Sequence, residues 1–112
     1  MHNLNSNEPF YQINQASKLL NVTSDRIRTY EEEGLIKPYR TAGGKRLFSQ
    51  NDIEWLILLR DLIKMGVSIP AARILLTAEI QKNSSFFKEK DNQIIELINK
   101  LKSHAAYSAV FG

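Results

Sequence analysis

The chain contains no cysteine, and its only two histidines, His2 and His104, lie far apart in the sequence. Disulfide bonds, thiolate metal sites and cysteine-based redox sensing are therefore excluded. Two separated imidazoles are also too few for a zinc motif, whose ligands come in closely spaced groups. The sequence predicts a protein with no metal site and no cofactor.

Long apolar runs and a targeting segment are lacking as well. The longest apolar stretch, Trp55–Leu59, is far shorter than the roughly 20 residues that cross a membrane. The start, MHNLNSNEPF, has neither the basic region nor the apolar region of a secretory signal. With 112 residues, the chain has room for one domain and a helical appendage. We expect a cytoplasmic protein without membrane contact.

The net charge of +3 is small, but the charges are unevenly distributed. Residues 37–46 hold four basic side chains and no acidic one, whereas residues 49–76 hold three of each. A local basic patch is typical of a nucleic-acid footprint. It indicates double-stranded DNA as a partner. An enzyme is not indicated, because the sequence shows neither a nucleophile–base pair nor a phosphate-binding glycine loop.

Capping signals predict a helix-turn-helix in the first third of the chain. A first helix is expected over residues 14–20, with its asparagine as the cap, and Asn21 suits the left-handed conformation that ends a helix. A second helix begins after Thr23 or Ser24 and stops at Gly34. Two short helices joined by such a tight turn form a DNA-binding motif.

A basic hairpin is expected next, over residues 39–48. Two short extended segments flank Gly43-Gly44, which is a typical hairpin turn. Its arginines and lysine could merely protect an edge strand from aggregation. The glycine tip and the absence of nearby acids favour a DNA-contacting wing. The acidic run Glu31–Glu33 is expected to be a solvated helix end that faces away from DNA.

Two further helices follow the hairpin. Ser49 and Asp52 form a capping-box pattern at the start of a helix that extends to about Met65. Ser68 caps the next helix, and Pro70 lies in its first turn, where the missing N–H does no harm. The predicted fold is mostly α: a winged helix-turn-helix DNA-binding domain with a small β-hairpin wing and a C-terminal dimerisation helix.

The predicted organisation has four parts. Residues 1–8 form a disordered tail, 9–80 the DNA-binding domain, 84–104 the dimerisation helix and 105–112 an apolar tail.

Trp55 is interpreted as core, rather than as part of a drug pocket. On the last helix, Phe87, Ile94 and Leu101 recur at seven-residue intervals with Ile98 between them, which makes an apolar stripe. This stripe could cover the domain's own helices, but a partner helix is the preferred interpretation. The apolar tail is either frayed or a docking segment. The residues expected at the dimer seam are Phe87, Ile94, Ile98 and Leu101.

Taken in order, the motifs of residues 10–76 resemble those of the MerR family of bacterial transcription regulators. The matching segments are Ile13–Val22, Ile27–Glu31 with Gly34–Ile36, Pro38 with Arg40–Ser49, Asp52-Ile53 and Gly66–Ile69. The resemblance implies a homodimer that binds a palindromic promoter site, with recognition helices in major grooves and wings on the flanking backbone. It also implies that Arg28, Tyr30, Arg40 and Arg46 contact phosphates.

The exposed start of the second helix is expected to read base edges through Ser24, Asp25 and Arg26. The full set of residues expected to contact DNA is Asn14, Thr23, Ser24, Asp25, Arg26, Arg28, Thr29, Tyr30, Arg40, Gly44, Lys45 and Arg46.

Departures from the family pattern indicate which branch the chain resembles. Thr29 stands where the family often has an aromatic residue, and Lys45 where metal and drug sensors usually have tyrosine. The stretch RTAGGKRLFS looks closer to the short heat-shock-repressor and glutamine-synthetase-repressor branches. We therefore expect a repressor controlled by a partner protein or by its own C-terminal segment. The alternatives are an excisionase-like or architectural DNA-bending factor, and an interaction module with a vestigial helix-turn-helix.

Overall fold

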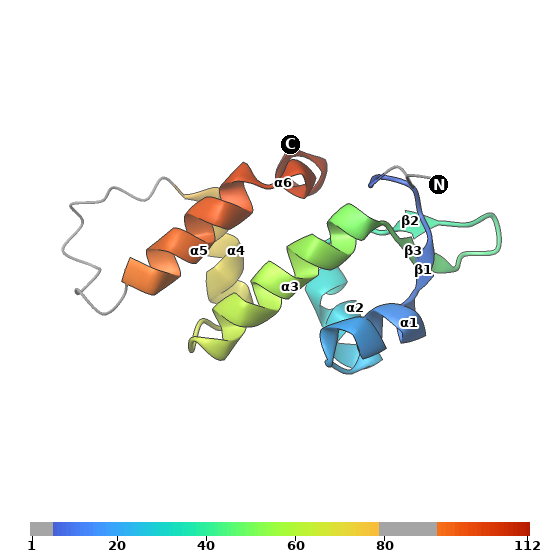
Figure 1. Ribbon diagram of the computed structural model, residues 1–112, viewed down its shortest axis with the longest axis horizontal. Coiled ribbons are helices and arrows are strands. Elements are labelled where there is room, and N and C mark those ends of the chain that lie inside the picture. The colour runs from blue at the N-terminus through green and yellow to red at the C-terminus, as the bar shows by residue number, and fades with distance from the viewer. Residues whose placement is uncertain (1–5, 79–91) are drawn as a thin grey trace, which may run out of the picture.

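The computed structural model describes residues 6–78 and 92–112. The helix α3 runs through the middle of the molecule. The helix-turn-helix and the sheet lie towards its N-terminal end, and α4 and α5 lie towards its C-terminal end (Figure 1). The elements in order are β1 (Tyr11–Gln12), α1 (Ile13–Leu20), α2 (Ser24–Glu32), β2 (Tyr39–Arg40), β3 (Arg46–Phe48), α3 (Gln50–Lys64), α4 (Ile69–Thr77), α5 (Asn92–Ser103) and α6 (Ala105–Phe111). The predicted mostly helical, winged helix-turn-helix fold is confirmed.

The first helix begins one residue earlier than predicted. Gln12 is the N-cap of α1, and its backbone N–H donates to Gln15 Oε1 at 2.8 Å. Asn14 therefore lies inside the first turn and is not the cap. Asn21 ends the helix at φ 54°, the left-handed conformation expected of it. Arg60 also caps this end, because its Nη1 donates to Leu20 O at 2.7 Å.

The second helix has a side-chain cap at its start and a glycine just after its end. Thr23 Oγ1 accepts a hydrogen bond from Arg26 N at 3.1 Å. Gly34 adopts φ 74°, a conformation that a side chain makes costly. Arg73 reaches from α4 to donate to Glu33 O at 2.8 Å. A cation at the C-terminal end of a helix is also favoured by the helix dipole.

Gly34→Ala should lower the free energy of unfolding by about 1–2 kcal/mol, because it forces a Cβ into a left-handed residue. The new Cβ would lie 2.1 Å from the present position of Arg73 Nη1, so it would also displace this cap. Gly43→Ala is the matched control, since Gly43 does not have a positive φ and its Cβ would come no closer than 3.9 Å to Thr41 Oγ1. Urea denaturation of the two variants measures the difference. Equal stability would contradict this account of Gly34.

The wing belongs to a three-stranded antiparallel sheet with the order β1-β3-β2, rather than to an isolated hairpin. The strand β1 pairs Tyr11 with Phe48, and Phe10 N donates to Phe48 O at 3.1 Å. The predicted disordered tail is also too long. Ser6 O accepts from Asn51 N at 2.9 Å and Asn7 Oδ1 accepts from Asn51 Nδ2 at 2.7 Å, so these two residues lie beside the start of α3.

The core lies around α3, which contacts α1, α4, α5, α6 and β3. Trp55 is fully buried, as predicted, and its Nε1 donates to Leu35 O at 2.6 Å. Ser49 Oγ accepts from Asp52 N at 3.0 Å, which confirms the capping box. Pro70 lies in the first turn of α4 as expected.

The stripe on α5 faces the chain's own core, which corrects the predicted dimer seam. Ile98 and Leu101 are fully buried, and α5 packs against α3 and α4. Ile94 is half-buried at the edge of the same core, and Phe87 lies outside the described residues. The opposite face of α5 is exposed and polar, with Gln93, Glu96, Asn99 and Lys100. The seven-residue spacing identified the apolar face correctly but assigned it the wrong partner.

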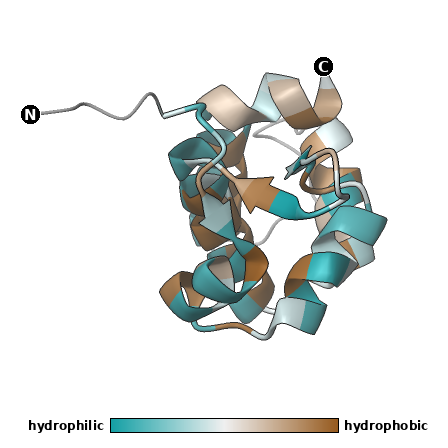
Figure 2. Ribbon diagram, turned by 90° about the vertical axis from the view of Figure 1, so that its right-hand side faces the viewer, coloured by the Kyte–Doolittle hydropathy of each residue, from teal (hydrophilic) through white to brown (hydrophobic). Residues whose placement is uncertain are grey.

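The predicted apolar tail is a helix, α6, docked over Trp55. Tyr107 Oη donates to Leu76 O at 2.6 Å, and the rings of Tyr107 and Phe111 each lie 6.2 Å from that of Trp55. Figure 2 shows this helix, beside the C label, mostly in the white-to-brown part of the hydropathy scale. Residues 105–111 are therefore not frayed, since they pack on the chain's own core, and docking of a partner on this segment stays a prediction. None of the described helices is long and apolar enough to cross a bilayer.

Ile98→Ala should reduce the free energy of unfolding by about 2–5 kcal/mol, the usual cost of truncating a buried aliphatic side chain. Ile74→Ala removes the same atoms from a residue that is 65% exposed and should change stability by less than about 0.5 kcal/mol. Because Ile98 is buried within one chain, its effect should not depend on protein concentration. A concentration-dependent loss would instead place Ile98 between two copies.

Candidate nucleic-acid interface

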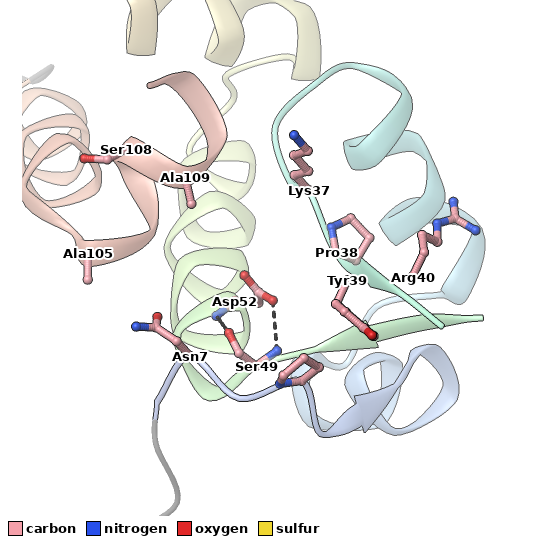
Figure 3. A pocket seen from close by; sticks show the side chains of 11 residues that line it. Asn7, Lys37, Pro38, Tyr39, Arg40, Ser49, Asp52, Ala105, Ser108 and Ala109 are labelled. Atoms are coloured by element: carbon pink, nitrogen blue, oxygen red, sulfur yellow. Dashed lines mark hydrogen bonds between the residues drawn. The ribbon is translucent and has the colours of Figure 1, made fainter. Parts of the chain in front are cut away.

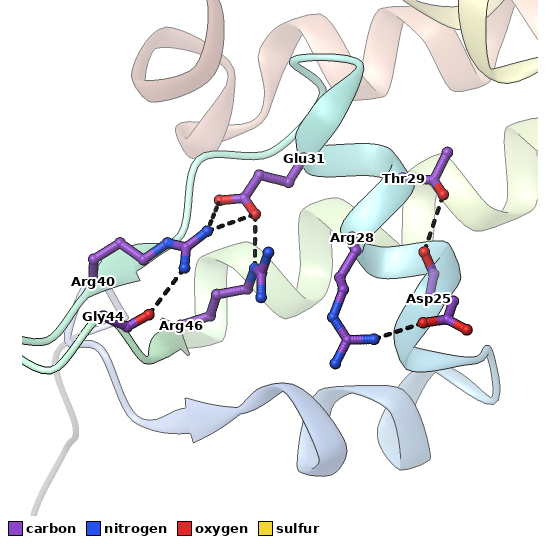
Figure 4. Close-up of polar contacts among 7 residues, drawn as sticks. All are labelled: Asp25, Arg28, Thr29, Glu31, Arg40, Gly44 and Arg46. Carbon is purple, nitrogen blue, oxygen red and sulfur yellow. Dashed lines mark hydrogen bonds and ion pairs between the residues drawn. The ribbon is translucent and has the colours of Figure 1, made fainter.

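The N-terminal half of α2 presents polar and basic side chains to solvent. Arg26 is exposed on the first turn. Arg28 Nη1 lies 2.7 Å from Asp25 Oδ1, and 41% of its side chain is exposed. Thr29 Oγ1 donates to Asp25 O at 3.0 Å (Figure 4). An exposed pair of this kind is weak, so a phosphate can displace Asp25 from Arg28.

Tyr30 does not belong to this surface, which corrects its predicted phosphate contact. Its side chain is 1% exposed and lies in the core, and its hydroxyl makes no hydrogen bond of standard geometry to a described residue. Burial raises the pKa of this hydroxyl, and the nearby cations Arg26 and Arg60 only partly oppose the shift. Tyr30 therefore anchors α2 to the core as a neutral phenol.

The wing tip carries a lysine that is available for binding. The turn is closed by Thr41, whose N donates to Lys45 O and whose O accepts from Gly44 N, both at 2.9 Å. Gly44 adopts φ 85° there, so the predicted glycine turn has a conformational reason. The Lys45 side chain is exposed and forms no ion pair within the described part of the chain.

The start of α1 lies beside the wing. A groove of about 410 Å³ between them is lined by Gln12, Ile13, Asn14, Gly44, Lys45 and Arg46. It brings four of the predicted contacts from two distant parts of the sequence to one surface, namely Asn14, Gly44, Lys45 and Arg46. A basic groove at the N-terminal end of a helix suits a phosphate group, since the helix dipole adds to the side-chain charges.

Glu31 connects the recognition helix to the wing, contrary to the expectation that the acidic run faces away. Its Oε1 lies 2.7 Å from Arg46 Nε and 3.0 Å from Arg40 Nη2 (Figure 4). No local signal in the sequence pairs residue 31 with residues 40 and 46, so this carboxylate was missed as a site residue. Arg40 and Arg46 are thus not free cations in this structure.

A second hollow, of about 730 Å³, opens between the N-terminal segment, β2, the start of α3 and α6 (Figure 3). Ser49 N donates to Asp52 Oδ2 at 2.8 Å, so the carboxylate that lines this hollow already caps α3. Burial raises the pKa of Asp52, and its hydrogen bonds with Ser49 oppose the shift. Within residues 6–78 and 92–112, no three His, Cys, Asp or Glu side chains are grouped to hold a metal ion.

A helix-turn-helix beside a basic wing defines a DNA-binding protein of the winged-helix class, and comparison with known proteins identifies the family. The model of the MerR HTH family of regulatory proteins matches residues 11–79. The chain belongs to this family.

Two curated relatives illustrate its range. The transcriptional regulator GlnR of Bacillus anthracis is 34% identical over 87 residues, which are 77% of this chain and 67% of the relative. The transcriptional regulator ZntR of Escherichia coli is 29% identical over 97 residues, which are 86% of this chain and 69% of the relative. The crystal structure of HiNmlR, a MerR family regulator lacking the sensor domain and bound to promoter DNA, superimposes with a TM-score of 0.54. That match covers 88% of this chain and 75% of HiNmlR at 20% identity, and it supports the fold.

Arg28→Ala and Arg46→Ala should each weaken binding to specific and to non-specific DNA, and each should lower the slope of log affinity against log salt by about one. The reason is that we expect each guanidinium to neutralise one phosphate. Lys64→Ala, at the far end of α3, removes the same charge away from this surface and should leave the slope unchanged. Fluorescence anisotropy at several salt concentrations measures all three. Slopes that match that of Lys64→Ala would remove these arginines from the interface.

Proposed function

We propose that the protein is a sequence-specific transcription regulator that binds a pseudo-palindromic promoter site as a homodimer. The observation that carries this proposal is the placement of accessible cations on two elements, with exposed Arg26 and partly exposed Arg28 on α2 and exposed Lys45 at the wing tip. Membership of the MerR family supports the same function. Membership of a family of helix-turn-helix regulators already makes the chain a DNA-binding regulator.

The proposed contacts divide by chemistry. Ser24, Asp25 and Arg26 lie at the start of α2, the part of a recognition helix that contacts base edges in the major groove. Arg28, Thr29, Lys45 and Arg46, with Asn14 and the backbone at Gly44, face the phosphates. Thr23 contributes indirectly, because it caps the helix that carries the reading residues.

The small size of this surface supports the proposed homodimer. One copy offers few phosphate contacts, and affinity for DNA rises with the number of phosphates neutralised. Two copies on a palindrome double that number and fix the spacing of the half-sites.

We propose control by a partner protein or by the C-terminal segment, in the manner of a repressor. The support is a physical connection between α6 and the segment that follows α2. The helix α6 packs on Trp55, and Trp55 hydrogen-bonds to Leu35, three residues after α2 ends. A ligand that displaced α6 would therefore uncover an indole held directly behind the recognition helix.

Selection of bound sequences from random DNA tests the function. We expect an inverted repeat. Arg26→Ala should then relax discrimination at one position of each half-site by about 1–3 kcal/mol, with guanine the expected base there. A uniform loss across all sequences would mark Arg26 as a backbone contact. Enrichment of a single half-site would contradict the dimer, and no enrichment with intact folding would contradict sequence-specific binding.

A further inference from the structure

Glu31 is the acidic side chain that joins α2 to the wing. It lies in the last turn of α2, and 22% of its side chain is exposed. Both of its oxygens contact Arg40 Nη2, at 3.0 and 3.1 Å, and Oε1 also accepts from Arg46 Nε at 2.7 Å. One carboxylate thus lies between two guanidinium groups from the two strands of the wing.

The two arginines use their donors differently. Arg40 donates through Nη2 to Glu31 and through Nη1 to Gly44 O at 2.9 Å. Its guanidinium therefore connects β2, the glycine turn and α2 at once. Arg46 donates to Glu31 only through Nε, and its two terminal nitrogens bond to none of the described residues. Arg46 can hold Glu31 and a phosphate together, whereas Arg40 must give up a bond to contact DNA.

The wing needs such a restraint. Its strands are two and three residues long, and a two-stranded ribbon of this size has little stability of its own. Its tip, residues 42–45, is exposed. Each ion pair alone contributes little in water, but a carboxylate shared by two guanidinium groups restricts all three side chains.

Given the DNA-binding function proposed above, we infer that Glu31 and Arg40 are positioning residues that hold the wing at a fixed orientation to the recognition helix. In this orientation, Arg46 and Lys45 meet the phosphates beside the groove that α2 enters. Glu31 favours DNA binding although its own charge repels DNA. Arg40 acts through its hydrogen bonds rather than through its charge. The clamp raises the affinity for DNA by preorganisation, because the free protein already holds the wing in the orientation that binding requires.

Three variants separate geometry from charge. Glu31→Gln and Glu32→Gln each raise the net charge by one, but Glu32 is exposed and forms no ion pair with a described residue. Arg40→Lys keeps the net charge, yet an ammonium group cannot reproduce the forked contacts of the guanidinium. The DNA is the duplex recovered by selection, and the readouts are its dissociation constant and the salt slope.

Glu31→Gln and Arg40→Lys should each weaken binding by about threefold to tenfold, the range that two partly exposed ion pairs allow. Glu32→Gln should bind equally well or more tightly, since it only removes repulsion. The salt slope of Arg40→Lys should stay at the wild-type value, because no phosphate contact is lost. Tighter binding by Glu31→Gln than by Glu32→Gln would overturn the inference, since Glu31 would then compete with the phosphates. Native affinity of Arg40→Lys would overturn it as well.

Hydrogen exchange in the free protein tests the clamp without DNA. The wing amides of Thr41 and Gly44 should exchange about threefold to tenfold faster in Glu31→Gln and Arg40→Lys than in Glu32→Gln. Equal exchange in the three variants would overturn the clamp, whatever their DNA affinity. Failure of the wild-type protein to bind any duplex would overturn the proposed function alone.

Discussion

The indole N–H of Trp55 must be hydrogen-bonded in a core that excludes water, and Leu35 O supplies the acceptor. This bond fixes α3 against the segment that leaves α2, and therefore fixes the direction in which the recognition helix points. The same ring is covered by α6 on its other side. The DNA-facing half and the C-terminal half of the molecule thus depend on one buried side chain. An aliphatic residue of similar size would fill the space but would leave Leu35 O without its partner.

Arginines perform three structural tasks before any contact with DNA. Arg60 and Arg73 cap the ends of α1 and α2 through Leu20 O and Glu33 O, and Arg40 ties the wing to α2. Each bond places a positive charge beside a carbonyl or carboxylate oxygen. At the C-terminal ends of α1 and α2, this charge also compensates the negative end of the helix dipole. The net charge of +3 therefore says little about the cations available to a phosphate. Arg26, Arg28 and Lys45 remain accessible, together with the terminal nitrogens of Arg46.

Apart from the cap of α1, which is Gln12 instead of Asn14, local signals predicted the local structure well, and the other failures are of longer range. Thr23, Ser49 and Ser68 cap the helices that follow them, because a cap needs only a hydroxyl within three residues of a backbone N–H. The resemblance of residues 10–76 to the MerR family placed the recognition helix and the wing. It could not show that Tyr30 is buried, because that depends on how α1 and α3 close over it. A short extended segment is expected between Pro9 and Ile13, but its pairing could not be predicted for a similar reason, since two residues without a periodic pattern become the strand β1 only beside β3.

The stripe of α5 shows where periodicity stops being informative. A heptad-like spacing states that one face of a helix is apolar, and burial of that face releases the same water whether the covering helix belongs to the same chain or to another. What decides the outcome is the surface already present in the chain. The helix α3 leaves Leu56, Leu59 and Leu62 to be covered, and α4 leaves Ala72 and Leu76. Ile98 and Leu101 cover this surface at no cost in translational entropy, whereas a second copy would have to lose that entropy on binding. The apolar face of α5 is thus satisfied within one chain, and an assembly of two copies must use other surface.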